Sequence, residues 1–201
     1  MAKLYFRYGA MSSGKSEQLV SIAMNYKVQG KRVLVFSPTS DTRTAALAGV
    51  VKSRNGAEWP SIRISPSDDP YETFRCATER LVDDIKCVLV DEAQFLTREQ
   101  VVSLTRIADA SDVPVIAFGL KADFRNRLFP GSEALVSLAD SLEEIKTVCW
   151  FCDRKGFLNL RMVGGKAVTE GDQVVMDEGD VRYVPVCRKC YVRILGEKAL
   201  A

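Results

Sequence analysis

The chain has 201 residues, of which 47% are hydrophobic and 27% charged, and its formal net charge at pH 7 is +2. These values are typical of one globular domain, or of one domain with a small appendage, and they exclude disordered and fibrous proteins. No apolar stretch approaches the length of a membrane span, and the first residues have the pattern of a strand instead of a signal peptide. We therefore expect a cytoplasmic protein without a membrane partner. Its nearly balanced charge argues against a broad surface for nucleic acid.

Histidine is absent from the sequence. Histidine is the commonest general base near neutral pH and the commonest metal ligand. Proton abstraction must therefore be assigned to a carboxylate, Lys, Tyr or Cys, and a zinc site must be built from thiolates or carboxylates.

Short apolar runs alternate with helical patterns along the first 145 residues. The runs expected to form buried strands are Leu4–Tyr8, Arg32–Phe36, Cys87–Val90 and Val113–Leu120. The segments expected to form helices are Ser16–Gln29, Tyr71–Ile85 and a third that begins with a capping box at Thr97 and Gln100 and continues through Ala108. The segments expected to form loops are Ser37–Gly56 and Ser65–Pro70. This alternation predicts an α/β domain with a parallel sheet and helices on both faces.

A phosphate-binding loop follows the first predicted strand. Its pattern is Gly-x-x-x-x-Gly-Lys-Ser, and its residues are Gly9, Ala10, Met11, Ser12, Ser13, Gly14, Lys15 and Ser16. We expect the backbone N–H groups of Ala10–Gly14 and the following helix dipole to face the phosphates of ATP. Lys15 would reach the β- and γ-phosphates, and the Ser16 hydroxyl would coordinate Mg²⁺. The alternative is a glycine-rich turn between a strand and a helix, without a ligand.

Two adjacent acids, Asp91 and Glu92, follow the predicted strand Cys87–Val90 in the segment CVLVDEAQF. A P-loop domain places its Mg²⁺-associated carboxylate at the end of such a strand, and successive residues of an extended chain point in opposite directions. We expect Asp91 to face the metal and Glu92 to act as general base, with Ala93 and Gln94 beside them in the nucleotide site. Glu92 could instead be a helix-capping or solvated acid.

Four cysteines form two C-x-x-C pairs, at Cys149 and Cys152 and at Cys187 and Cys190. Two such pairs predict a tetrahedral structural Zn²⁺ site, although the segment between them is longer than the usual gap of about 15–20 residues. Disulfides and a redox-active pair are the alternatives. The remaining cysteines, Cys76 and Cys87, are expected to be packed thiols.

Several motifs together resemble the type II thymidine kinases, the thymidine kinase 1-like family, in its bacterial branch. In chain order they are GAMSSGKSE, DTR at Asp41–Arg43, SRNG at Ser53–Gly56, DEAQF, GLKADFRNRLFPGS at Gly119–Ser132, and the split cysteine pairs. The resemblance covers nearly the whole chain. It implies a RecA-like P-loop domain at residues 1–145 and a zinc-binding domain at residues 146–201, from which a lasso loop covers the substrate.

The resemblance also implies an activity and a site. The activity is Mg²⁺-dependent transfer of the γ-phosphate of ATP to the 5′-OH of thymidine, with dTTP as feedback inhibitor and a homotetramer as the assembly. Glu92 would take the proton of the 5′-OH. The residues implied to line the pyrimidine pocket and the lasso are Phe95, Leu120, Phe124, Phe129, Val174, Val175, Met176, Asp177 and Tyr183, with Met11 as a further wall residue.

Three further residues adjoin these motifs. Arg43 and Arg125 are candidates for stabilising charge in phosphoryl transfer, although each could be a surface ion-pair residue. Asp41 is the acid to consider if Glu92 is not the base.

Two other functions use the same features. One is a P-loop ATPase whose zinc ribbon grips nucleic acid, with the basic residues near the second cysteine pair on its surface: Arg182, Arg188, Lys189 and Arg193. The other is a nucleotide-binding scaffold without catalysis, which requires Glu92 to be idle.

Overall fold

A six-stranded parallel sheet forms the centre of the protein in the computed structural model, which describes residues 1–41, 49–80, 84–171, 173 and 180–200. The strand order is β5-β2-β6-β7-β1-β8, and every neighbouring pair is parallel. The strands are β1 (Leu4–Tyr8), β2 (Arg32–Pro38), β5 (Ile62–Ile64), β6 (Ile85–Val90), β7 (Val115–Gly119) and β8 (Ser141–Glu144). The predicted parallel α/β sheet is confirmed.

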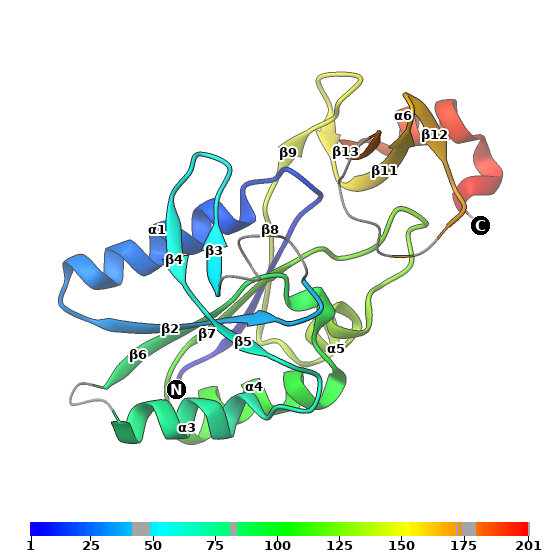
Figure 1. Cartoon of the computed structure of the whole chain (residues 1–201). Helices are drawn as coiled ribbons and strands as arrows, with labels where there is room; N and C mark the ends of the chain where they lie inside the picture. Colours follow the sequence, from blue (N-terminus) through cyan, green and yellow to red (C-terminus); the bar gives the residue numbers. More distant parts are fainter. Residues whose placement is uncertain (42–48, 81–83, 172, 174–179, 201) are drawn as a thin grey trace.

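Both faces of this sheet are covered, because successive residues of each buried strand alternate between two hydrophobic clusters. In β6, Val88 and Val90 pack towards one face, and Cys87 and Leu89 towards the other. The first face is covered by α3 (Pro70–Arg80), α4 (Arg98–Ser111) and α5 (Pro130–Leu138). The second is covered by α1 (Lys15–Val28) and a hairpin of β3 (Val50–Lys52) and β4 (Glu58–Pro60). Figure 1 shows α1 and this hairpin on the opposite side of the sheet from α3 and α4.

The expected loop at Ser37–Gly56 contains regular structure, so that prediction is wrong. Strand β2 extends to Pro38, and Val50–Lys52 forms β3. Val51 is buried against the α1 face of the sheet, which is a tertiary contact that the polar, glycine-containing composition of the segment does not indicate. Residues 42–48 of this segment lie outside the described residues.

The predicted helix Tyr71–Ile85 is also too long. Helix α3 is described as Pro70–Arg80, residues 81–83 lie outside the described residues, and Ile85 is the first residue of β6, where it pairs with β2. Ile85 belongs to the same hydrophobic cluster as Phe74. Its apolar side chain therefore matched the helical spacing of the sequence, although its backbone is extended. Cys76 is exposed and not packed, because it lies two positions from the buried Phe74 and so faces away from it on the helix. Cys87 is buried, as expected, and burial raises the pKa of its thiol to about 12.

A second, smaller unit follows β8. Its strands and helices are β9 (Thr147–Val148), β10 (Lys155–Gly156), β11 (Leu158–Val163), β12 (Lys166–Val168), β13 (Val181–Val186), α6 (Arg188–Leu195) and the 3-10 helix η2 (Glu197–Leu200). Strand β11 is the centre of an antiparallel sheet, and the unit has its own hydrophobic cluster around Leu160, Val186 and Tyr191. The separate sheet and cluster support the proposed division at residues 145 and 146, which stays a prediction.

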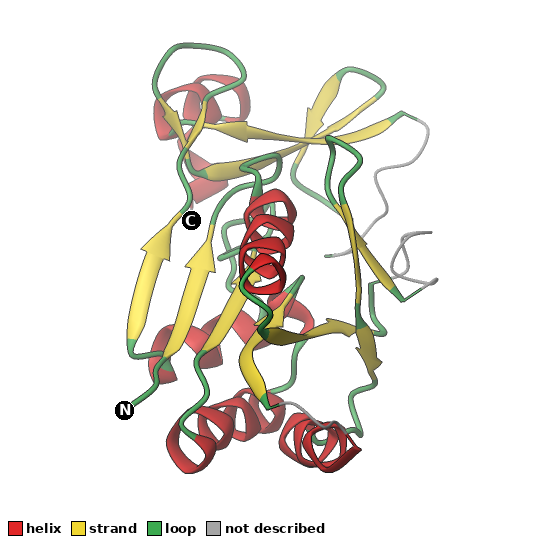
Figure 2. Cartoon of the chain, turned by 90° about the vertical axis from the view of Figure 1, so that its left-hand side faces the viewer, coloured by secondary structure: helices red, strands yellow, loops and turns green. Residues whose placement is uncertain are grey.

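The second unit lies at the carboxyl edge of the parallel sheet. Figure 2 shows strands of the parallel sheet pointing towards it. The loops that follow β1 and β7 contact the second unit through Asn159. No helix within the described ranges is long and apolar enough to cross a lipid bilayer.

The capping box at the start of α4 is confirmed and gives a stability prediction. Thr97 Oγ1 accepts a hydrogen bond from the Gln100 backbone N–H (3.2 Å), and Gln100 Oε1 accepts one from the Thr97 N–H (3.1 Å). We expect Thr97→Ala to lower the free energy of unfolding by about 1 kcal/mol, because one N–H group at the start of the helix loses its acceptor. Urea titration of both proteins measures this difference.

Thr97→Ser is the matched control, since it keeps the accepting hydroxyl. A loss in Thr97→Ser as large as that in Thr97→Ala would show that the methyl group, not the cap, stabilises the helix.

Candidate functional site

The phosphate-binding loop leaves β1 and ends in α1. Its first residue, Gly9, donates its backbone N–H to the carbonyl of Gly119 (3.2 Å), which joins the loop to the end of β7. A Cβ atom on Gly9 would lie 2.8 Å from the Ile145 carbonyl oxygen, so a side chain does not fit there. Gly14, directly before α1, has φ 84°, a left-handed conformation that glycine adopts without strain. The two glycines of the motif are therefore required by the shape of the loop.

Lys15 is the first residue of α1, and its side chain folds back over the loop. Its Nζ donates to the carbonyl of Ala10 (2.9 Å) and lies 3.4 Å from that of Gly9. The side chain is buried, so its ammonium group is held next to the loop whose N–H groups are expected to bind phosphate.

Ser16 and Asp91 meet at the carboxyl edge of the sheet. The Ser16 hydroxyl lies 3.3 Å from both carboxylate oxygens of Asp91, which is only 3% exposed. The Asp91 backbone N–H donates to the Phe36 carbonyl (3.0 Å), so the position of Asp91 is determined by the pairing of β6 with β2. A hydroxyl and a carboxylate side by side are the hard oxygen ligands that Mg²⁺ prefers, and these two residues fit such an ion.

Glu92 differs from the extended geometry expected for it. Its φ is 48°, because the chain turns there into the 3-10 helix η1 (Ala93–Phe95). The two acids nevertheless have different partners, as expected. Gln94 donates from Nε2 to Glu92 Oε2 (2.5 Å) and accepts from the backbone N–H of Leu120 through Oε1 (3.0 Å). This amide is 1% exposed, and it fixes the Glu92 carboxylate relative to the segment that follows β7.

Aromatic side chains expected around the pyrimidine form two contacting pairs. The ring centroids of Phe95 and Phe129 lie 5.9 Å apart, with the rings at 79°. Phe124 and Tyr183 have centroids 6.2 Å apart, and Tyr183 comes from β13 of the second unit. Leu120 is buried at the end of β7, and its carbonyl accepts from the Ser132 hydroxyl (2.5 Å). Each of the two aromatic pairs thus joins residues that are far apart in sequence.

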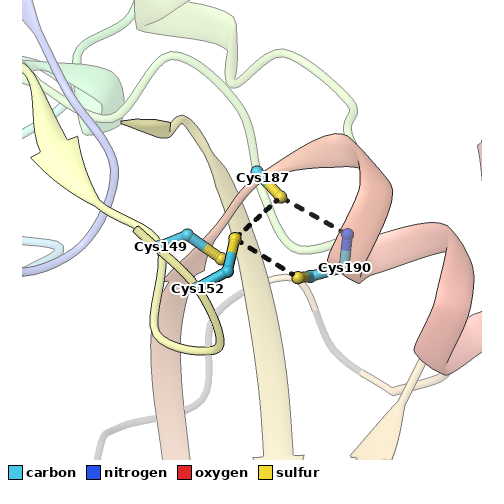
Figure 3. A group of neighbouring side chains, drawn as sticks. All are labelled: Cys149, Cys152, Cys187 and Cys190. Carbon is cyan, nitrogen blue, oxygen red and sulfur yellow. Dashed lines mark hydrogen bonds between the residues drawn. The ribbon is translucent and has the colours of Figure 1, made fainter. Parts of the chain in front are cut away.

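The four cysteines of the C-x-x-C pairs converge. Their sulfur atoms all lie within 4.8 Å of one another, and Cys152 Sγ is 3.7 Å from the sulfur atoms of both Cys187 and Cys190. Figure 3 shows one pair on the turn after β9 and the other at the start of α6. A Zn–S bond of about 2.3 Å separates the corners of a thiolate tetrahedron by about 3.8 Å, so the cluster fits a zinc ion. Burial disfavours the Cys149 thiolate, yet hydrogen bonds from the backbone of Cys187 and Phe151 and from neighbouring thiols lower its pKa to about 7.

The family model for thymidine kinases matches residues 2–191. The chain belongs to the thymidine kinase family. A thymidine kinase of Lactococcus lactis subsp. lactis is 45% identical over 193 residues, which are 96% of this chain and 98% of that one. One of Streptococcus pyogenes serotype M3 is 46% identical over 191 residues, or 95% and 97% of the two chains. The resemblance seen in the motifs is thus confirmed. The crystal structure of Pif1 helicase from Candida albicans aligns at a TM-score of 0.42 with 15% identity, over 72% of this chain and 36% of that one.

Two further predicted residues of this thymidine kinase family member, Arg125 and Asp41, follow strands of the parallel sheet. Arg125 Nε is 3.4 Å from Asp123 Oδ2, and its guanidinium lies 5.3 Å from the Phe124 ring centroid. Asp41 is buried beyond the carboxyl end of β2. Five predicted residues lie outside the described residues: Arg43, and Val174, Val175, Met176 and Asp177 of the lasso.

Three polar residues in or in contact with the segment that follows β7 were not expected from the sequence: Asp123, Asn159 and Arg161. Asp123 accepts from the backbone N–H groups of Arg125 (2.8 Å) and Arg127 (2.9 Å) and from Gln173 Nε2 (3.2 Å). Arg161 lies 5.2 Å from the Phe124 ring centroid, and Asn159 hydrogen-bonds two loops of the parallel-sheet unit. Asp123 lies within the quoted GLKADFRNRLFPGS motif, which was a usable signal. Asn159 and Arg161 lie in no motif, and only their tertiary contacts identify them.

The thiol cluster leads to a metal prediction. We expect freshly purified, reduced protein to contain one Zn²⁺ per chain, and Cys187→Ser to lose most of it, because a serine hydroxyl is a poor substitute for a thiolate. Metal analysis by mass spectrometry measures the stoichiometry. If the metal anchors the second unit, Cys187→Ser also weakens thymidine binding.

Cys76→Ser is the control, since Cys76 is exposed and outside the cluster. Wild-type protein without zinc, or equal zinc in Cys187→Ser and Cys76→Ser, would contradict the assignment.

Proposed function

We propose that this chain phosphorylates thymidine, transferring the γ-phosphate of ATP to the 5′-OH in the presence of Mg²⁺ and giving dTMP. The observation that carries the proposal is one constellation in a thymidine kinase family chain. The Ser16 hydroxyl of the phosphate-binding loop lies 3.3 Å from Asp91, and the next residue, Glu92, is tied through Gln94 to the pocket residue Leu120.

Positive charge next to the transferred group is the first requirement of the reaction. Negative charge spreads over the γ-phosphoryl oxygens in the transition state, so catalysis is mainly positioning and charge stabilisation. We assign phosphate binding to the backbone of Gly9–Ser16 and charge stabilisation to Lys15, whose Nζ already lies on this loop. Bound Mg²⁺, held by Ser16 and Asp91, would supply further positive charge beside the phosphates.

The second requirement is a base for the 5′-OH. Glu92 is the candidate, since the chain has no histidine and this carboxylate follows Asp91 at the end of β6 and is linked through Gln94 to Leu120. Gln94 donates to one carboxylate oxygen, Oε2, and this contact orients the group that would accept the proton. We propose Glu92 as the base and Gln94 as the residue that positions it.

The third requirement is a site for the thymine ring. We propose that the apolar and aromatic side chains of Phe95, Leu120, Phe124 and Phe129, with Tyr183, line this site; the contacts of Phe95 with Phe129 and of Phe124 with Tyr183 support the proposal. The lasso residues 174–177 are proposed to cover the base. Zinc on the four cysteines would anchor both ends of the second unit, from which the lasso starts and to which it returns.

The resemblance also leads us to propose dTTP as feedback inhibitor and a homotetramer as the assembly. Inhibition by added dTTP and sedimentation analysis test these two proposals separately.

A direct assay tests the activity. Purified protein is incubated with ATP, Mg²⁺ and thymidine, and dTMP is measured beside ATP hydrolysis in the presence and absence of DNA. We expect dTMP formation and no stimulation by DNA. DNA-stimulated hydrolysis without dTMP would overturn the proposal in favour of a nucleic-acid ATPase.

Lys15→Ala should abolish phosphotransfer without unfolding the protein. The ammonium group donates to carbonyls of its own loop, and its loss removes charge from the phosphate site. We expect kcat to fall by at least about 10²-fold, in the range of removing one transition-state contact. Steady-state kinetics and circular dichroism measure the two effects.

Lys31→Ala is the control, because Lys31 is exposed and hydrogen-bonds Gln29 on the surface. Near-normal turnover in Lys15→Ala would disprove the role of the loop.

Glu92→Gln is the sharpest test of the base. The amide keeps the size of the side chain and much of its hydrogen bonding, but it cannot accept a proton. We expect kcat to fall by about 10²–10⁴-fold while binding of thymidine and ATP changes little. Single-turnover kinetics measure the chemical step.

Asp91→Asn provides the comparison, since it should raise the Mg²⁺ concentration needed for activity as well as lower turnover. A wild-type chemical rate in Glu92→Gln would remove Glu92 as the base and make Asp41 the next acid to test.

A further inference from the structure

Asn159 is a buried polar residue of the second unit whose side chain is turned towards the parallel-sheet unit. It lies on β11 and is 5% exposed. Both ends of its amide make hydrogen bonds, and both partners are backbone groups of loops at the carboxyl edge of the sheet. No part of the phosphoryl-transfer chemistry above uses this residue.

One partner is the phosphate-binding loop. Asn159 Oδ1 accepts from the backbone N–H of Met11 at 2.8 Å. Met11 lies between the two glycines of the loop, among the N–H groups expected to face the phosphates. In this structure its N–H donates to Asn159 of the second unit instead. A side chain from outside the parallel-sheet unit therefore holds the phosphate-binding loop.

The other partner is the segment after β7. Asn159 Nδ2 donates to the carbonyl of Ala122 at 3.0 Å. Ala122 lies between Leu120 and Phe124, two residues of the proposed pyrimidine pocket. The reversed amide orientation would place the NH₂ group against the Met11 N–H and the oxygen against the Ala122 carbonyl, so only the stated orientation satisfies both partners.

We propose that Asn159 is a positioning residue that holds the phosphate-binding loop and the thymidine-binding segment at a fixed separation. This inference rests on the proposed function. The γ-phosphate is bound by one loop and the 5′-OH is presented by the other, so their distance depends on this link. A misplacement of about 1 Å can cost about 10²-fold in rate without any loss of a catalytic group.

A second link between the two units provides a matched comparison. Tyr191 on α6 donates its hydroxyl to the carbonyl of Phe124 (2.8 Å) and is fully buried. It contacts the thymidine-binding segment but makes no described hydrogen bond to the phosphate-binding loop. We call the two hydrogen bonds of Asn159, to Met11 and to Ala122, the bridge between the two loops. Tyr191→Phe removes a buried hydrogen bond between the units and leaves this bridge intact.

The first experiment compares Asn159→Ala with Tyr191→Phe. We expect Asn159→Ala to lower kcat by at least about tenfold, while the dissociation constants of MgADP and thymidine, each measured alone, change by less than about threefold. Tyr191→Phe should change kcat by less than about threefold and act mainly on KM for thymidine. An unchanged kcat in Asn159→Ala, or an equal fall in both variants, would overturn the proposal, as would a loss confined to ligand affinity.

The second experiment keeps the proposal testable if Asn159→Ala does not fold. A protonated Asp at this position donates to the Ala122 carbonyl and accepts from the Met11 N–H as the amide does, whereas an ionised Asp repels the carbonyl. We therefore expect kcat of Asn159→Asp, relative to wild type, to rise at least about fivefold as the pH falls from about 8 to about 6, since burial raises the pKa of a carboxyl group. A ratio that is flat with pH, at any level, would overturn the proposal.

A third measurement does not depend on activity, so it separates this inference from the proposed function. Amide hydrogen exchange should speed up in both the 9–16 and 119–126 segments of Asn159→Ala, but only in the second segment of Tyr191→Phe. If wild type forms no dTMP, the proposed function fails while the bridge is still tested by exchange. Unchanged exchange in the 9–16 segment of Asn159→Ala would overturn the bridge itself.

Discussion

Parallel pairing of β6, β7 and β1 is the constraint on which the rest of the structure depends. Because the three strands run in the same direction and lie side by side, the segments that follow them emerge at one edge of the sheet. Those segments are the phosphate-binding loop, the acids Asp91 and Glu92, and the pocket segment from Leu120. The residues proposed to bind phosphate and metal, to act as base and to line the acceptor site thus follow neighbouring strands, although they come from widely separated parts of the chain.

Close contact between these segments depends on positions where no side chain fits. A Cβ atom on Gly119 would lie 2.8 Å from Gln94 Oε1 and 3.0 Å from the Gln94 backbone nitrogen. Glycine at the end of β7 therefore lets η1 pack directly on that strand, and Gln94 can then reach both Glu92 and the Leu120 N–H. The geometry of the proposed base is determined by this backbone packing as much as by Glu92 itself.

The second unit closes the open edge of the sheet and also takes part in its organisation. It brings Tyr183 against Phe124, joins Tyr191 to the Phe124 carbonyl, and places the Asn159 amide between two loops. Its small hydrophobic cluster includes the four cysteines, so a metal on them would stiffen the same elements that contact the pocket. A small domain that could not bury a large core alone can in this way hold side chains firmly enough to position substrates.

Local chemistry was readable from the sequence by itself. The glycine spacing and Lys15 identified the phosphate-binding loop, the apolar runs identified the buried strands, the Thr97 and Gln100 pair identified a helix start, and the cysteine spacing identified a four-thiol cluster. Each of these signals depends on neighbouring residues, on chain periodicity or on ligand type. Tertiary structure alone decided the strand order, the burial of Val51 in a segment of loop-like composition, and the end of α3 before Ile85. It also decided the contacts of Gln94, Arg161 and Asn159. These features depend on contacts between segments far apart in the chain. The residues next to Asn159 in the sequence do not indicate which groups its amide hydrogen-bonds.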